Sequence, residues 1–238
     1  MIHVVGIGPG FREGRTLEAE SILKTADVLV GYTTYRALIR EDFPDKEMLS
    51  TGMRSETERC EEAIRLSREG KRVAVICSGD SQVYGMASLL LQLAEENDEI
   101  TVIPGVTAAL SAAARLGAPF SGDLAIISLS DLLTPWAVIE KRLRAAAFGD
   151  FPLAIYNPGS HTRREHLSRA CDILLAERSP ETPCGLVRNI GREGQQTKLL
   201  TLSALQDEPV DMLTTVIIGS SSTIIRHGRL LTPRGYRV

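Results

Sequence analysis

Three glycine-containing segments carry the residues best suited to holding a ligand. They are residues 6–10 (GIGPG), 78–85 (SGDSQVYG) and 104–108 (PGVTA), and each follows a short apolar run and precedes a helical pattern. Glycine lets main-chain groups approach a polar ligand closely, and Asp80 can accept hydrogen bonds from hydroxyl or ammonium groups. We expect all three turns at the carboxyl edge of one parallel sheet, where open α/β sheets bind ligands.

The first glycine segment does not match the common nucleotide-binding motifs. A dinucleotide site needs a small residue where Phe11 stands and a carboxylate at the end of the second strand, and residues 28–32 end without one. The triphosphate-binding motif G-x-x-x-x-G-K-[ST] is absent from the sequence. Neither NAD nor a nucleoside triphosphate is therefore expected.

Strands and helices alternate along the chain, which predicts an α/β protein. The expected strands are 2–6, 28–30, 72–77, 100–103, 124–128, 153–156, 185–188, 197–202 and 214–218. The expected helices are 17–26 behind an N-capping Thr16, 56–69, 84–95, 107–116, one from 135, and 162–175. Ser55 and Glu58 have the spacing of a capping box. Residues 118–123 have the composition of a linker, which predicts domains at 1–117 and 124–238.

Composition excludes several classes of protein. The 238 residues are 43% apolar and 24% charged, enough to bury a core. No apolar stretch approaches the ~20 residues of a membrane helix, and the N-terminus begins a strand, so we expect a cytoplasmic protein. A net charge of −3 argues against nucleic-acid binding. No metal site is expected, because Cys60, Cys77, Cys171 and Cys184 are scattered singly and His161 and His166 are badly spaced.

Five motifs in order along the chain resemble the tetrapyrrole methylase family. They are VVGIGPG (4–10), SGDxxVYG (78–85), IPGVTAA (103–109), IYNPGS (155–160) and VRNIGREG (187–194). Residues 31–35, 128–136 and 232–236 are similar to the subgroup of precorrin-3B C(17)-methyltransferases of cobalamin biosynthesis. Two positions depart from the family pattern, which usually has proline where Ser81 stands and asparagine where Ser220 stands.

The resemblance implies two α/β domains with S-adenosylmethionine (SAM) in the cleft between them. The matching positions assign to the cofactor Pro9, Ser78, Gly79, Asp80, Val83, Tyr84, Thr107 and Ala108 in the first domain, and Tyr156, Asn157 and Ile190 in the second. Replacing Ser81 by proline is expected to tighten cofactor binding slightly, because proline lowers the entropy of the open loop.

The resemblance also implies methylation of carbon 17 of a precorrin-3 macrocycle with coupled ring contraction, in a homodimeric enzyme. Ser130 and Asp131 are candidate catalytic groups near the reacting face, with Asp131 as a base, although both also fit an ordinary strand-to-helix turn. The macrocycle carries many carboxylates, which guanidinium groups bind in bidentate fashion. The candidate substrate-binding residues are Arg12, Arg15, Arg36, Arg163, Arg192 and Arg234.

Three alternatives stay open on the sequence alone. A same-fold methylase could act at another ring carbon, a more distant relative could methylate RNA, and a tetrapyrrole-binding module could lack catalysis. The negative net charge disfavours RNA, and the cofactor-binding positions in both domains disfavour a carrier. The sequence does not distinguish a cobalt-containing from a metal-free substrate.

Overall fold

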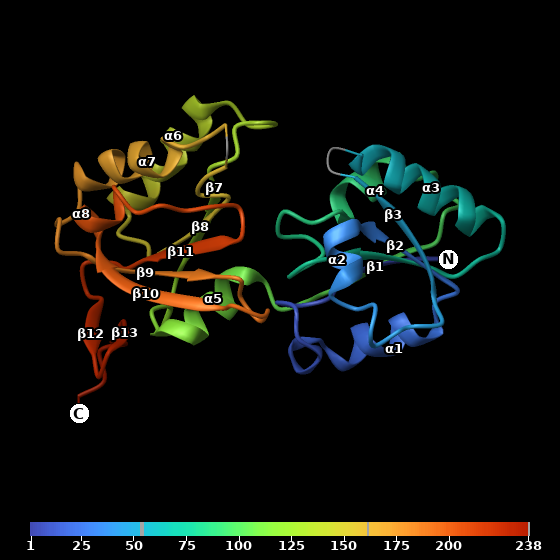
Figure 1. Cartoon of the computed structure of the whole chain (residues 1–238). Coiled ribbons are helices and arrows are strands. Elements are labelled where there is room, and N and C mark those ends of the chain that lie inside the picture. Colours follow the sequence, from blue (N-terminus) through green and yellow to red (C-terminus); the bar gives the residue numbers. More distant parts are fainter. Residues whose placement is uncertain (53–54, 161, 238) are drawn as a thin grey trace. The chain divides into compact units, whose positions relative to one another are not determined.

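The first hundred residues form a five-stranded parallel sheet in the computed structural model, which describes residues 1–52, 55–160 and 162–237 (Figure 1). The strands lie in the order β3-β2-β4-β1-β5, and every neighbouring pair is parallel. They are β1 (Ile2–Gly6), β2 (Val28–Tyr32), β3 (Glu47–Thr51), β4 (Val73–Cys77) and β5 (Ile100–Ile103). Strands β1 and β4 are buried along their whole length, because helices cover both faces of the sheet.

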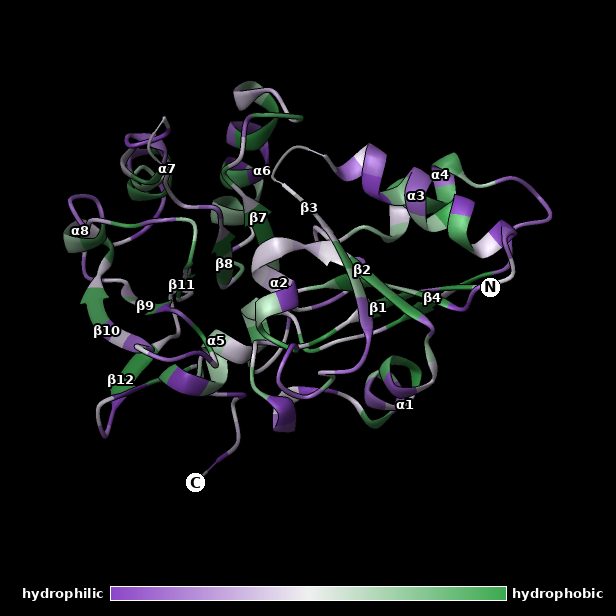
Figure 2. Ribbon diagram, turned by 45° about the vertical axis from the view of Figure 1, so that its right-hand side comes forward, coloured by the Kyte–Doolittle hydropathy of each residue, from purple (hydrophilic) through white to green (hydrophobic). Residues whose placement is uncertain are grey.

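Alternation of side chains along β1 divides the core of this unit into two layers. Val4 packs with α3 and α4 on one face, and Val5 packs with α1 on the other. The helices are α1 (Leu17–Thr25), α2 (Thr33–Ala37), α3 (Glu56–Arg68) and α4 (Ala87–Leu93), and a 3-10 turn η1 spans Arg12–Gly14. Figure 2 shows mostly green, apolar ribbon near the label of β4, whereas α3 is partly purple. Thr16 caps α1 through a 3.1 Å hydrogen bond from the Ala19 N–H.

The second half of the chain forms a mixed sheet in the order β10-β9-β11-β8-β7. Only β7 and β8 pair in parallel, and the other neighbours are antiparallel. The strands are β7 (Ala125–Ser128), β8 (Leu153–Tyr156), β9 (Pro183–Arg188), β10 (Gln196–Thr201) and β11 (Thr214–Ile218). Helices α6 (Trp136–Phe148), α7 (His166–Leu175) and α8 (Leu202–Leu205) pack on one face of this sheet around the buried Leu143 and Leu174.

The division between the two units differs from the predicted one. The chain separates into Met1–Ala108 and Ala109–Val238, so nearly all of α5 (Ala108–Leu116) belongs to the second unit. The reason is packing: the Leu116 side chain lies so close to Gly185 of β9 that a Cβ there would be 2.7 Å from it. The predicted linker is also not wholly a linker, because β6 (Gly117–Ala118) pairs with β13 (Arg229–Leu231).

Several elements were not predicted from the sequence. These are β3, α2, α8, the two-residue β6 and the hairpin of β12 (Ile224–Arg226) with β13 (Arg229–Leu231). The predicted capping box is wrong, since Ser55 makes no capping hydrogen bond to α3 through its side chain. The α/β fold class itself is confirmed. Among the described residues, no helix has the length and apolar character needed to cross a membrane.

Candidate active site

Glycines bring the loops after β1, β4 and β5 into main-chain contact at the carboxyl edge of the first sheet. Gly8 and Gly79 exchange two N–H···O bonds of 3.0 and 2.8 Å. A Cβ on Gly105 would lie 2.2 Å from the Gly79 oxygen, and one on Gly6 would lie 2.6 Å from the Gly105 nitrogen. No side chain fits at Gly6 or Gly105. The predicted gathering of three turns at this edge is therefore confirmed.

Asp80 fastens two of these loops together. Its Oδ1 accepts the N–H groups of Gln82 (2.8 Å) and Val83 (3.0 Å), and its Oδ2 accepts that of Gly105 (3.0 Å). Burial would raise the pKa of the Asp80 carboxyl, but these donors, Gly105 first, outweigh it and hold the pKa below its ordinary value. Asp80 is thus an ionised brace that shapes the loop expected to face the cofactor.

Ser81 is fully buried and adds a second tie between the same loops. Its Oγ donates a 2.8 Å hydrogen bond to the Ile103 carbonyl at the end of β5. Its N–H also stabilises the Asp80 carboxylate. Proline at this position would remove both interactions, so the structure does not support the expected gain from that substitution.

The remaining cofactor candidates of the first unit surround this junction. Pro9 and Thr107 are buried, Ser78, Val83 and Ala108 are half-buried, and Tyr84 is exposed. Tyr84 has a φ of 56°, a left-handed conformation that is unusual for a bulky residue and is often found in functional loops. Gly79 also has a left-handed φ of 71°, and a Cβ there would touch nothing closer than the Ala108 nitrogen at 3.5 Å. Main-chain polar groups and small apolar side chains at one edge fit the polar and apolar parts of SAM.

A second set of loops meets at one edge of the second sheet. Strands β7, β8 and β9 all end there, because β7 is parallel to β8 and both β8 and β9 are antiparallel to β11. Asn157, directly after β8, has a φ of 51° and donates a 2.9 Å hydrogen bond from Nδ2 to Ser128 Oγ. The same Ser128 oxygen accepts the Ser130 N–H at 3.1 Å. The loops that hold Asn157 and Ser130 are thereby joined.

Tyr156 and Ile190 lie at the same edge. The Tyr156 hydroxyl accepts the Ala109 N–H at the start of α5, at 2.6 Å. Ile190 is buried and follows Asn189, whose φ is 53°. Asn157 after β8 and Asn189 after β9 thus both have left-handed backbones, a feature that tightens both turns.

Asp131 lies in the loop after β7 and contacts His166, a residue to which the sequence analysis assigned no role in the site. The Asp131 Oδ2 lies 3.0 Å from His166 Nε2, and His166 is the first residue of α7. The close approach of His166, with a smaller effect from the charge of Arg163, lowers the pKa of Asp131 although burial opposes it. No sequence motif indicates this pair, because the two residues are far apart along the chain. His161, considered with His166, lies outside the described residues.

The six candidate arginines differ in their surroundings. Arg12 is 58% exposed in its side chain and pairs with Glu20 at 3.0 Å, whereas Arg15 is buried (2% exposed) between Glu20 and Asp42. Arg36 donates to Ser50 Oγ at 3.3 Å, and Arg234 is exposed beside Tyr236. Arg163 and Arg192 are half-buried near the carboxyl edge of the second sheet. Arg15 therefore has an internal role, and its side chain does not face a ligand.

Thiol and metal chemistry have no support in the described residues. All four cysteines are buried and unpaired, and burial raises the pKa of Cys60 to about 11 and those of Cys77 and Cys171 to about 12. No group of three His, Cys, Asp or Glu side chains within residues 1–52, 55–160 and 162–237 is placed to hold a metal ion.

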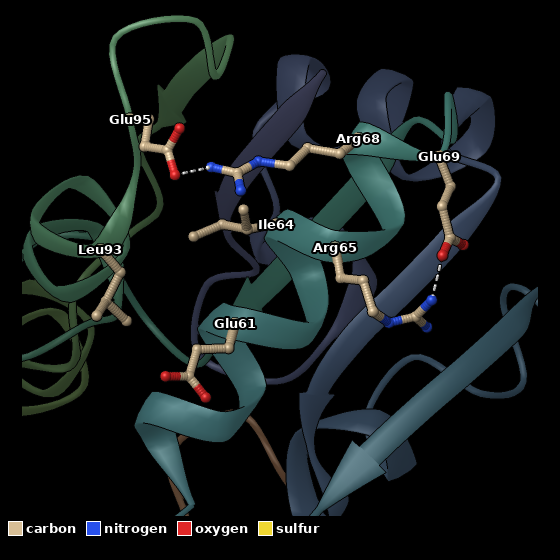
Figure 3. A pocket seen from close by; sticks show the side chains of 7 residues that line it. All are labelled: Glu61, Ile64, Arg65, Arg68, Glu69, Leu93 and Glu95. Carbon is tan, nitrogen blue, oxygen red and sulfur yellow. Dashed lines mark hydrogen bonds and ion pairs between the residues drawn. The ribbon is translucent and has the colours of Figure 1, made fainter.

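A pocket on the first unit lies away from these loops (Figure 3). It is lined by Glu61, Ile64, Arg65, Arg68, Glu69, Leu93 and Glu95, from α3 and the end of α4. Two ion pairs join charged residues of its lining, Arg65 with Glu69 and Arg68 with Glu95, the latter at 3.0 Å. Arg65 and Arg68 lie in the last turns of α3, which lead to the amino end of β4, so the pocket is not at the carboxyl edge.

Known proteins resemble this chain over nearly its whole length. The model of the family Tetrapyrrole (Corrin/Porphyrin) Methylases matches residues 1–206. A Salmonella typhimurium protein named "Probable cobalt-factor III C(17)-methyltransferase" is 47% identical over 99% of each chain. The crystal structure of the methyltransferase CobJ gives a TM-score of 0.90 at 37% identity, covering 98% of this chain and 99% of that one. A Thermus thermophilus uroporphyrin-III C-methyl transferase complexed with S-adenyl homocysteine gives 0.71 at 24% identity, over 92% and 91%, which shows a shared fold.

The fold, the loops at the strand ends and the similarity to known proteins define the class of protein as a SAM-dependent methyltransferase. The chain belongs to the tetrapyrrole (corrin/porphyrin) methylase family. The family predicted from the five sequence motifs is therefore confirmed, as are the transferase activity and the cofactor.

Proposed function

We propose that the chain methylates carbon 17 of cobalt-factor III, a precorrin-3 type macrocycle that contains cobalt, with coupled ring contraction in cobalamin biosynthesis. The observation that carries this proposal is the end-to-end 47% identity with a protein named for that activity. It favours carbon 17 over another ring carbon. The cobalt in that name favours a metallated substrate, which the sequence motifs had left open.

The residues that hold the cofactor in this proposal are the candidates that the sequence motifs indicate in both units. SAM, when bound, supplies a methyl group on a positively charged sulfur. The glycine junction and Pro9, Ser78, Val83, Tyr84, Thr107 and Ala108 would bind it in the first unit. Tyr156, Asn157 and Ile190 would bind it in the second, and Asp80 would act through the loop that it braces.

The chemistry of methyl transfer suits a site built from such residues. Attack by an electron-rich ring carbon needs no nucleophilic side chain, and the buried cysteines supply none. What the protein must do is hold two reactants in line and exclude water, which can lower a barrier by several kcal/mol. Rigid loops tied by main-chain bonds, such as those at Gly8 and Gly79, are appropriate for this task.

The substrate would be bound through its peripheral carboxylates. Arg12, Arg36, Arg163, Arg192 and Arg234 remain the proposed contacts, and Arg15 leaves the set because its guanidinium is buried against Glu20 and Asp42. Ser130 and Asp131 remain the proposed polar groups at the reacting face.

Two measurements test this function. Titration calorimetry should show binding of S-adenosylhomocysteine to the purified chain, and Asn157→Ala should weaken it without lowering the melting temperature by more than a few degrees. Incubation with SAM and cobalt-factor III should then give a product heavier by one methyl group, located at carbon 17 by NMR. A methyl group at another ring carbon, or none, would contradict the proposal.

The homodimer and the cytoplasmic location stay predictions. Light scattering of the purified chain checks the first, with a mass of twice 25.9 kDa expected. Fractionation of the source cells checks the second.

A further inference from the structure

His166 holds Asp131 in one orientation at the carboxyl edge of the second sheet. The His166 side chain is 12% exposed and that of Asp131 is 40% exposed, so the carboxylate extends from a largely buried support. The Asp131 Oδ2 lies 3.0 Å from His166 Nε2. The more accessible part of the pair is therefore the carboxylate.

The imidazole is itself held on its other side. The Trp136 indole packs edge-to-face against it, with ring centroids 4.9 Å apart. The Arg169 guanidinium lies 4.0 Å from the centre of the Trp136 ring. Because these contacts come from the first turns of α6 and α7, the ring has little freedom to turn Nε2 away from Asp131.

The surroundings of Asp131 favour a permanent negative charge. The carboxylate contacts the first residue of α7, a ten-residue helix whose N-terminus carries partial positive charge. The His166 imidazole, 3.0 Å from the carboxylate, and the charge of Arg163 keep the pKa of Asp131 below its ordinary value. A carboxylate with these neighbours is a weak base, and it is well suited to stabilising positive charge.

We propose that Asp131 is an anionic counter-charge for the macrocycle during methyl transfer, and that His166 is a positioning residue acting through Asp131. The inference rests on the proposed function. In methyl transfer the new C–C bond uses an electron pair of the macrocycle, and the pair of the broken C–S bond stays on sulfur. The macrocycle therefore gains one unit of positive charge. A fixed carboxylate at the reacting face stabilises that charge more in the transition state than before it.

The test compares three single variants and one double variant. His166→Phe keeps an aromatic ring against Trp136 but removes the N–H donor, whereas His166→Gln keeps a donor. We expect kcat for methyl transfer to fall about tenfold or more in Asp131→Asn and in His166→Phe, with KM for SAM within about twofold. His166→Gln should recover most of the rate. The double variant of Asp131→Asn and His166→Phe should be no slower than Asp131→Asn alone, because His166 acts only through Asp131.

A measurement that does not require enzymatic turnover separates loss of the His166–Asp131 pairing from misfolding of a variant. The ¹⁵N NMR shift of His166 Nε2 in the free protein should change in Asp131→Asn, and an unchanged shift would overturn the pairing. Independent, multiplying losses in the double variant would overturn the positioning role. If Asp131→Asn transfers methyl at the normal rate and stalls before ring contraction, Asp131 is a base and the counter-charge is wrong. If the wild-type chain transfers no methyl group at all, the proposed function fails instead.

Discussion

An aspartate and a serine, as at positions 80 and 81, can either bind a ligand or hold neighbouring loops together. In the structure, Asp80 and Ser81 hold loops together. Every oxygen of the Asp80 carboxylate accepts at least one main-chain N–H, and the Ser81 hydroxyl is bound to the Ile103 carbonyl. The motif predicted that these residues would lie among the loops of the carboxyl edge. It did not predict their partners, because Gly105 and Ile103 come from another strand end more than twenty residues away.

Replacement of Asp80 by asparagine should destabilise the first unit. The asparagine NH₂ group would face either the Gly105 N–H or the N–H groups of Gln82 and Val83, and in each case hydrogen bonds are lost. The expected cost in unfolding free energy is about 1–3 kcal/mol. The native pKa is depressed, so the carboxylate contributes stability above its ordinary pKa of 3.8, and that contribution disappears as the pH falls through the native value. Urea unfolding should show a large difference between wild type and Asp80→Asn near neutral pH. A difference that does not shrink in acid would contradict this account.

Ser81→Pro should weaken the first unit, which reverses the expectation from sequence. The substitution removes the Oγ–Ile103 hydrogen bond and the Ser81 N–H beside Asp80, and these losses exceed the ~0.4–1 kcal/mol that proline gains at compatible sites. Ser81→Ala is the matched control, because it removes only the hydroxyl. We expect the unfolding free energy to decrease in the order wild type, Ser81→Ala, Ser81→Pro. Tighter S-adenosylhomocysteine binding by the proline variant in calorimetry would restore the original expectation.

Strands that are continuous apolar runs were predicted more accurately than strands of mixed sequence. Strands β1 and β4 are continuous apolar runs, and both were placed within one residue. Strand β3 has the mixed sequence EMLST and pairs on one side only, so its pattern resembles a loop. In the hairpin of β12 and β13, Ile224 and Ile225 are exposed, so burial gives no alternating pattern there. The predicted end of the first domain, at residue 117, also differs from the observed end at Ala108. The packing of Leu116 near Gly185 is a long-range contact, which a local sequence pattern does not reveal.

The junction of the three loops depends on glycine at Gly105. Gly105→Ala would place a Cβ 2.2 Å from the Gly79 oxygen and 2.7 Å from the Gly6 carbonyl carbon, so the main chain must move. We expect a loss of several kcal/mol in unfolding free energy, or a folded protein whose S-adenosylhomocysteine affinity falls at least tenfold. Gly52→Ala is the matched control, because a Cβ there meets nothing within 4 Å. Equal stability and affinity in the two variants would show that the loops do not interlock as described.

At the scale of the whole molecule, the net charge of the chain has the same sign as that of its proposed substrate. The chain carries a net charge of −3, although the proposed substrate is a polyanion. Long-range attraction therefore cannot bring the substrate to the protein, and recognition must depend on local guanidinium contacts. Exposed contacts of this kind are screened by salt, whereas a buried pair such as Arg15 with Asp42 is affected much less.

The contrast between Arg12 and Arg15 tests this view of substrate binding. Arg12 is exposed and forms an ion pair with Glu20, so Arg12→Ala should raise KM for the macrocycle several-fold and leave S-adenosylhomocysteine affinity nearly unchanged. Arg234→Ala should behave alike, and added salt should raise the wild-type KM toward that of the variants. Arg15→Ala should instead lower the unfolding free energy, because the carboxylates of Glu20 and Asp42 would lose their ion pairs with Arg15. Steady-state kinetics at two salt concentrations, with urea unfolding in parallel, separates the two roles. A wild-type KM in both Arg12→Ala and Arg234→Ala would remove these two side chains from the substrate site.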